Sequence, residues 1–196
     1  MRLFSSPSGP QPDETTGSLE AMPRPAGAWL FGKIPAHGDF ISRGLSPEMQ
    51  EALDNWLSAG LAQARDRFAD FDDRYRLAAP WHFVDCDAAG AWSGGALCPS
   101  VDKVGRRFPI LVAAPAENAA EAAGVARAAL ELVFVALGDG WEADRLHEAL
   151  GRVDPDAGGA PPAGAVWAIE AEDGTSIEMP GRFPEGLIGR MLELAQ

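Results

Sequence analysis

Short turns between apolar segments limit the folds open to this chain of 196 residues. Residues 81–86 and 91–98 are apolar runs joined by a turn around residues 87–90, a spacing typical of an antiparallel hairpin. Residues 165–171 and 175–179 flank an Asp-Gly pair, which is a second hairpin signal. Because parallel neighbours need long crossover connections, two hairpins predict a mixed, largely antiparallel sheet.

Two long helices are predicted from their first residues. Ser46-Pro47-Glu48 supplies a cap, a proline at the first helical position and a favourable carboxylate, and apolar residues then recur every three or four positions as far as Phe68. Asn118 begins a second, alanine-rich helix that ends near residue 138. Both helices are expected to pack on the core.

Further strands are predicted near residues 28–31 and 108–114, and shorter helices at 141–150 and after Pro184. Gly94 and Gly95 inside a predicted strand indicate either a bulge or a close backbone approach. Because strands and helices are interspersed, the expected fold is α/β, three-layer α/β/α with a mixed, largely antiparallel sheet and helices on both faces.

The first 25 residues are rich in Ser, Pro, Gly and Thr, with few apolar groups to offset the entropy of ordering. They are predicted to form a disordered leader, residues 1–25. The remaining residues, 26–196, are of ordinary size for a single domain.

Charge and hydropathy exclude two classes of partner. The net charge is −13, which repels phosphate backbones, so no nucleic-acid partner is expected. No apolar run approaches the roughly twenty residues that span a bilayer, and the N-terminus lacks the apolar core of a secretory signal. We therefore expect no membrane insertion and a cytoplasmic location.

Cys86 and Cys98 are expected to be reduced, buried thiols. A disulfide bridge between them remains an alternative if their strands are neighbours.

Two segments combine glycine and proline with charged side chains. The lysine segment, residues 31–43, has the sequence FGKIPAHGDFISR, and the arginine segment, residues 99–109, has the sequence PSVDKVGRRFP. Glycine and proline are typical of turns, so both segments are predicted to contain loops. The candidate site residues are Lys33, His37, Asp39, Arg43, Ser100, Asp102, Lys103, Arg106 and Arg107.

These residues allow two interpretations. The two segments hold five of the 16 Lys and Arg residues, although the chain as a whole is acidic. In the first interpretation, Asp39 and Asp102 brace the loops through bonds to turn amides and arginines. In the second, the cations form a recognition patch for an acidic surface of a partner protein. The two interpretations are compatible.

Enzymatic alternatives have weaker support. Gly27 and Gly32-Lys33 have P-loop spacing, but Ile34 replaces the hydroxyl residue that would hold magnesium, and Pro35 follows. The three histidines lack metal-binding spacing, so no metal and no cofactor are expected. No serine or cysteine has the setting of a nucleophile. The alternative that stays open is a small hydrolase or phosphate-binding enzyme that uses His37, Asp39 and Asp102.

Together, the lysine and arginine segments resemble the TagF family of type VI secretion-associated proteins. Trp56-Leu57 and the run APWHF at residues 79–83 are similar to the intervening signatures of that family, and the resemblance is dense from about residue 28 to residue 115.

The resemblance implies a three-layer α/β domain and a regulatory role without enzymatic activity. The expected function is post-translational repression of type VI secretion assembly by protein–protein binding. The expected partner is a forkhead-associated scaffold protein or another component of the secretion system.

Overall fold

The computed structural model describes residues 19–154, 164–170 and 176–195. One seven-stranded sheet has the order β2-β1-β5-β4-β3-β6-β7. Its strands are β1 (Trp29–Gly32), β2 (Ile41–Arg43), β3 (Trp81–Cys86), β4 (Trp92–Cys98), β5 (Ile110–Ala116), β6 (Val166–Glu170) and β7 (Ser176–Pro180). Every pairing between these described strands is antiparallel, so the predicted α/β fold with a largely antiparallel sheet is confirmed.

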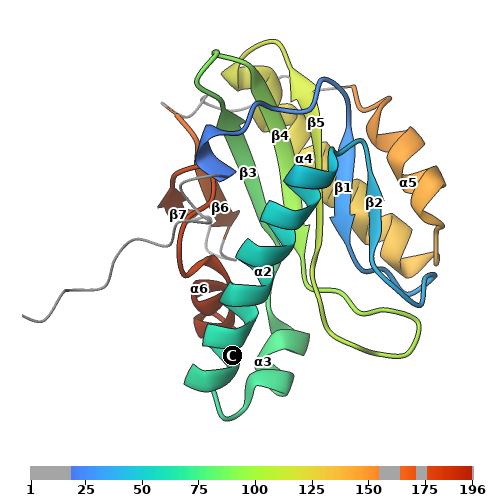
Figure 1. The fold of residues 1–196 in the computed structure, drawn as a ribbon, viewed down its shortest axis with the longest axis vertical. Helices are drawn as coiled ribbons and strands as arrows, with labels where there is room; N and C mark the ends of the chain where they lie inside the picture. The colour runs from blue at the N-terminus through green and yellow to red at the C-terminus, as the bar shows by residue number, and fades with distance from the viewer. Residues whose placement is uncertain (1–18, 155–163, 171–175, 196) are drawn as a thin grey trace, which may run out of the picture.

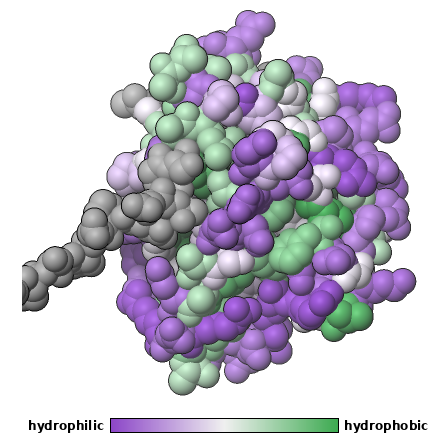
Figure 2. Space-filling view, in the orientation of Figure 1, coloured by the Kyte–Doolittle hydropathy of each residue, from purple (hydrophilic) through white to green (hydrophobic). Residues whose placement is uncertain are grey.

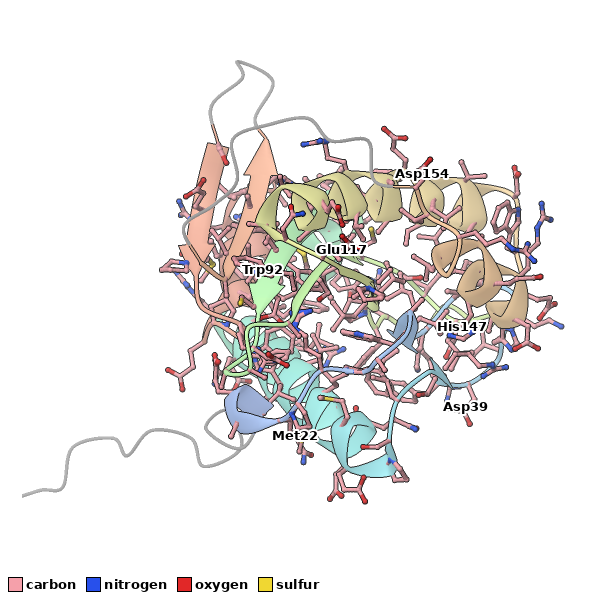
Figure 3. All side chains as sticks on the ribbon, turned by 90° about the horizontal axis from the view of Figure 1, so that it is seen from above. Met22, Asp39, Trp92, Glu117, His147 and Asp154 are labelled. Carbon is pink, nitrogen blue, oxygen red and sulfur yellow. The ribbon has the colours of Figure 1, made fainter. Side chains whose placement is uncertain are left out.

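Helices lie on both faces of the sheet (Figure 1). The helices on one face are α2 (Pro47–Arg67), α3 (Phe71–Leu77) and α6 (Leu187–Glu193). The helices on the other are α4 (Ala119–Gly138) and α5 (Ala143–Leu150). The same division is visible from above, where the sheet lies between α4 and α2 (Figure 3).

Alternating side chains of the strands supply two apolar cores. Leu97 and Leu111 contribute to the core beneath α2 and α6, whereas Ala96, Ile110 and Val112 contribute to the core beneath α4 and α5. All five are buried. This period of two is what an antiparallel sheet covered on both faces requires.

Both predicted helix starts are confirmed. The Ser46 hydroxyl accepts a hydrogen bond from the amide of Met49 at 3.2 Å, and α2 begins at Pro47. The Asn118 side chain accepts bonds from the amides of Ala120 and Glu121, each at 3.0 Å. These side chains satisfy amides that have no partner within the helix.

Gly94 permits the close packing of β4 against α4. A Cβ atom at this position would lie 2.0 Å from the carbonyl oxygen of Ala122 and 2.5 Å from the amide nitrogen of Ala126. Of the two alternatives for this glycine, the structure therefore shows a close backbone approach, and it lies within the regular β4 ladder.

The structure differs from the sequence predictions at three places. Strand β2 and helix α3 were not predicted. Residues 1–18 lie outside the described residues, but residues 19–25 of the expected leader pack on the domain, because Leu19 is fully buried and Arg182 donates hydrogen bonds to the carbonyl oxygens of Glu20 and Met22. Strands β6 and β7 pair as predicted, whereas the Asp-Gly turn between them lies outside the described residues.

Within the described part of the chain, no helix combines the length and the apolar character that crossing a bilayer requires. Cys86 and Cys98 are both free thiols. Each is the last residue of its strand, β3 and β4, and because these strands are antiparallel the two thiols lie at opposite ends of the hairpin. Burial raises the pKa of Cys98 to about 12, so its reactive thiolate form is suppressed.

Candidate functional site

The lysine and arginine segments meet at one end of the sheet. The lysine segment leaves the end of β1, and the arginine segment leads into the start of β5. Gly32 pairs with Ile110 in the sheet, which places the two loops side by side. The amide of Lys103 also donates a hydrogen bond to the carbonyl oxygen of His37 at 2.8 Å. Two segments about 70 residues apart in the chain therefore form one surface.

Asp102 is the centre of this junction, and its carboxylate is fully buried. One oxygen, Oδ1, accepts hydrogen bonds from the amides of Val104 and Arg106 at 3.0 and 2.9 Å. The other, Oδ2, accepts from Lys33 Nζ at 3.0 Å and from Arg106 Nε at 2.7 Å. The Arg106 guanidinium also donates to the carbonyl oxygen of Gly38 at 2.6 Å, so it joins the arginine segment to the lysine segment.

The electrostatics of Asp102 favour its ionised form. Burial raises the pKa of the carboxyl, but the hydrogen bonds from Arg106, Lys33 and the Val104 amide lower it by more. The pKa of Asp102 therefore lies well below its ordinary value. A carboxylate that is held ionised by four donors fixes a loop, and it is a poor general acid or base near neutral pH.

Aromatic rings close the same junction. Phe40 packs edge-on against Phe108 at a centroid distance of 4.7 Å and stacks with Phe31 at 6.0 Å. The Lys33 ammonium lies 4.7 Å from the centroid of the Phe40 ring. The lysine segment is thus held to the arginine segment by apolar contacts as well as by charge.

His37 and Arg43 contact α5, away from Asp102. His37 Nε2 lies 2.8 Å from Oε2 of Glu142 and 3.2 Å from the amide nitrogen of Ala143. The Arg43 guanidinium donates to Asp144 at 2.6 Å, and this bond lowers the pKa of the Asp144 carboxyl.

Asp39 and Lys103 have exposed side chains. The Asp39 carboxylate accepts a hydrogen bond from the adjacent amide of Phe40 at 2.8 Å. Asp39 lies on the same side of the molecule as His147 and far from Trp92 (Figure 3). The structure therefore places Asp39 in a local turn and leaves it outside the Asp102 cluster.

Arg107 and Ser100 lie beside α3. The Arg107 guanidinium contacts the Asp72 carboxylate at 3.0 Å, and its side chain is 32 % exposed. The amide and carbonyl of Ser100 both bond to the hydroxyl of Tyr75, at 3.1 and 3.2 Å. Burial raises the pKa of Tyr75, although its bond to Ser100 lowers the pKa in part, so this phenol is neutral and can both donate and accept.

A cavity of about 330 Å³ lies between α3, α4 and the arginine segment. Its apolar lining residues are Pro35, Tyr75, Pro99, Val101 and Leu137. Polar groups of Arg76, Ser100 and Arg107 complete the wall. The residues of the enzymatic alternative, His37, Asp39 and Asp102, do not line this cavity, and their side chains contact three different sets of neighbours.

Phe40 and Tyr75 are site residues that the sequence predictions missed. Tyr75 lies on α3, which was not predicted, although Phe71 and Tyr75 have the four-residue spacing of a helix face.

Within the described residues, no group of three or more His, Cys, Asp or Glu side chains is placed to hold a metal ion.

Residues 29–152, which contain both segments and the Asp102 cluster, match the family model described as the TagF N-terminal domain, type VI secretion system-associated. The chain belongs to the TagF family. The resemblance of the two segments is thus confirmed, and TagF membership makes this a type VI secretion-associated protein.

The fold has a counterpart in a solved structure. The crystal structure of PA0076 from Pseudomonas aeruginosa PAO1 superposes with a TM-score of 0.65 at 22 % sequence identity. The match covers 84 % of this chain and 93 % of that chain, so it extends beyond the region of the family model. No curated protein matches the sequence at a significant level.

Proposed function

We propose that this TagF protein represses type VI secretion assembly after translation, in the cytoplasm, by binding a component of the secretion system. A forkhead-associated scaffold protein is the proposed partner. The family match over residues 29–152 carries the proposal, because that region includes both loops at the end of the sheet.

The contacts at the loops support binding over turnover. Lys33 and Asp102 are buried and bonded to each other, so they fix the shape of the surface and are not available to a partner. The arginine segment nevertheless exposes Lys103 and, in part, Arg107, whose ion-pair partner among the described residues is the exposed carboxylate of Asp72. A rigid loop with an exposed lysine and a partly exposed arginine suits recognition of an acidic protein surface.

The proposal is tested by capture of the purified scaffold protein on the immobilised full chain. The variants are Lys103→Glu and Arg107→Glu, each made singly. Arg152→Glu is the matched control, since Arg152 is an exposed arginine of an i,i+4 pair and does not lie in either segment. Each variant changes the net charge by the same amount, so a general charge effect would appear in all three.

We expect wild type and Arg152→Glu to capture the scaffold equally, and the two loop variants to capture at least about 5-fold less. Circular dichroism verifies that each variant is folded. Equal capture by all four proteins would assign the loop cations a purely structural role. Absence of capture by folded wild type would contradict the proposed partner.

A further inference from the structure

We propose that the cavity beside the arginine segment receives one apolar side chain from an acidic peptide segment of the partner protein. The inference rests on the proposed function, because the peptide belongs to the protein that this chain binds. Two independent features of the cavity indicate this occupant: its apolar lining and the charges at its rim.

The lining accommodates an apolar group. The volume of about 330 Å³ lies in the range of pockets that bind small ligands or single anchoring side chains. Proline, tyrosine, valine and leucine side chains form most of the wall. Burial of an aromatic or leucine side chain among such residues contributes about 1.5–3 kcal/mol of transfer free energy.

Ser100 lines the cavity, and its hydroxyl group is buried. The residue is only 7 % exposed, and among the described residues its hydroxyl oxygen has no hydrogen-bond partner. Its amide and carbonyl are bonded to Tyr75, and the carbonyl also accepts a hydrogen bond from the Phe108 amide. Buried hydroxyls are nearly always paired in native proteins. This oxygen is closed to solvent, so it is not counted among the groups that contact the peptide.

The rim of the cavity is cationic. Arg76 and Arg107 line it, and no acidic side chain does so within the described chain. Each arginine contacts an exposed aspartate, Arg76 with Asp73 at 3.1 Å and Arg107 with Asp72 at 3.0 Å. Because exposed ion pairs contribute little, an incoming carboxylate replaces them at small cost. The preferred flanking residues of the peptide are therefore Asp and Glu.

Two exposed apolar residues are sequence neighbours of residues that line the cavity. Val104 precedes the lining residue Gly105 and is 71 % exposed, and Leu77 follows Arg76 and is 57 % exposed. Figure 2 shows green, hydrophobic surface among purple, hydrophilic residues at the lower right, where the arginine segment lies in Figure 1. Such residues exclude water around an anchor when a partner covers them.

The direct test is titration of the isotopically labelled full chain with synthetic peptides, followed by amide chemical shifts. The probe is a set of nine-residue peptides with one central Leu, Phe or Trp between acidic residues. The control set has lysines in place of the acidic residues. We expect the acidic set to shift the amides of Ser100, Val101 and Gly105, and to bind at least about 10-fold more tightly than the lysine set.

Three results would overturn the proposal. Equal binding of the two peptide sets would remove the charge argument. Concentration-dependent shifts of the same amides without peptide would assign the cavity to a second copy of this chain. Shifts of those amides on deletion of residues 1–18 would assign it to the chain's own N-terminal segment.

Variants separate the cavity from the rest of the surface. Leu137→Trp fills the cavity and is expected to weaken peptide binding by at least about 10-fold, and Arg76→Glu by about 5-fold. Arg152→Glu matches Arg76→Glu, because the two side chains have almost equal exposure, 73 and 72 %, and both form local pairs with an acidic residue. Arg152→Glu is expected to bind the peptide as wild type does.

Scaffold capture then separates this inference from the proposed function. If wild type captures the scaffold and folded Leu137→Trp captures it equally well, the cavity proposal fails and the proposed function stands. If wild type binds the acidic peptides at the cavity but does not capture the scaffold, the proposed partner fails and the cavity proposal stands.

Discussion

Replacement of Lys33 by methionine tests whether the buried ion pair fixes the two loops. Loss of one partner from a buried pair costs roughly 3–5 kcal/mol. Here Arg106 Nε stays bonded to the same Asp102 oxygen at 2.7 Å, and the methionine keeps an apolar contact with Phe40. We therefore expect Lys33→Met to lower the free energy of unfolding by about 2 kcal/mol at pH 7, below the usual range for such a change.

The pH dependence of this difference gives the reasoning a second test. The pKa of Asp102 is lower in the folded protein than in the unfolded protein, where it is about 4. The ionised carboxylate therefore stabilises the fold above about pH 4, and this stabilisation is lost as the pH falls through the lowered folded pKa. Lys33 provides one of the bonds that lower this pKa. The unfolded pKa is the same in both proteins, so the difference in unfolding free energy between wild type and Lys33→Met is constant near neutral pH and shrinks only as the pH falls through the folded pKa of Asp102 in the variant.

Urea unfolding at pH 7 and pH 3 measures the loss of unfolding free energy in Lys33→Met and its dependence on pH. A loss of about 2 kcal/mol lowers the urea midpoint by about 1 M, and the melting temperature by about 4–8 °C. Lys103→Met is the control, since Lys103 has the same charge and lies in the arginine segment but is exposed; no measurable change is expected. A Lys33→Met midpoint equal to that of Lys103→Met, or a difference in unfolding free energy that is larger at pH 3 than at pH 7, would refute the reasoning.

The other predictions concern packing and hydrogen bonds, and the same unfolding assay measures them. Gly94→Ala forces a Cβ against the carbonyl of Ala122 and is expected to cost about 3 kcal/mol, whereas Gly138→Ala, where the space is open, costs nothing measurable; equal effects would contradict the close approach. Ser100→Ala removes a buried unpaired hydroxyl and is expected to leave stability unchanged or raise it by up to about 1 kcal/mol; a loss of 1 kcal/mol or more would reveal a bond of this hydroxyl within the domain. Tyr75→Phe leaves the Ser100 amide without its partner, whereas the Ser100 carbonyl keeps the bond from the Phe108 amide; a loss of about 1–2 kcal/mol is expected, and no loss would show that water replaces the phenol.

The sequence predicts the locally determined elements of this fold well. Caps at Ser46 and Asn118 locate α2 and α4, and short turns locate the hairpins, because these signals act over a few residues. Helix α3 escapes prediction because it has seven residues and buries only Phe71 and Tyr75. Strand β2 has three residues, too few for an alternating pattern.

The candidate site depends on contacts that the sequence does not specify. Lys33 and Asp102 are 69 positions apart, and they meet because β1 and β5 are neighbours in the sheet, a strand order that no local signal gives. Residues 19–25 join the fold through Arg182, which is 162 positions from Glu20. The charged residues of the two segments can be picked out from the sequence alone. Whether each one braces a loop or faces a partner depends on contacts between distant residues, which the sequence does not show.

The most direct test of the central claim measures secretion itself. Expression of the full chain is induced in cells with an active type VI system. A secreted component is then quantified in the medium, and the levels of the apparatus proteins are quantified inside the cells. The proposal predicts that secretion falls while the apparatus proteins stay at their normal levels, and that Arg107→Glu represses less than Arg152→Glu at equal abundance. Unchanged secretion on induction of the folded wild-type chain would contradict the claim, and so would a fall in secretion that follows loss of the apparatus proteins.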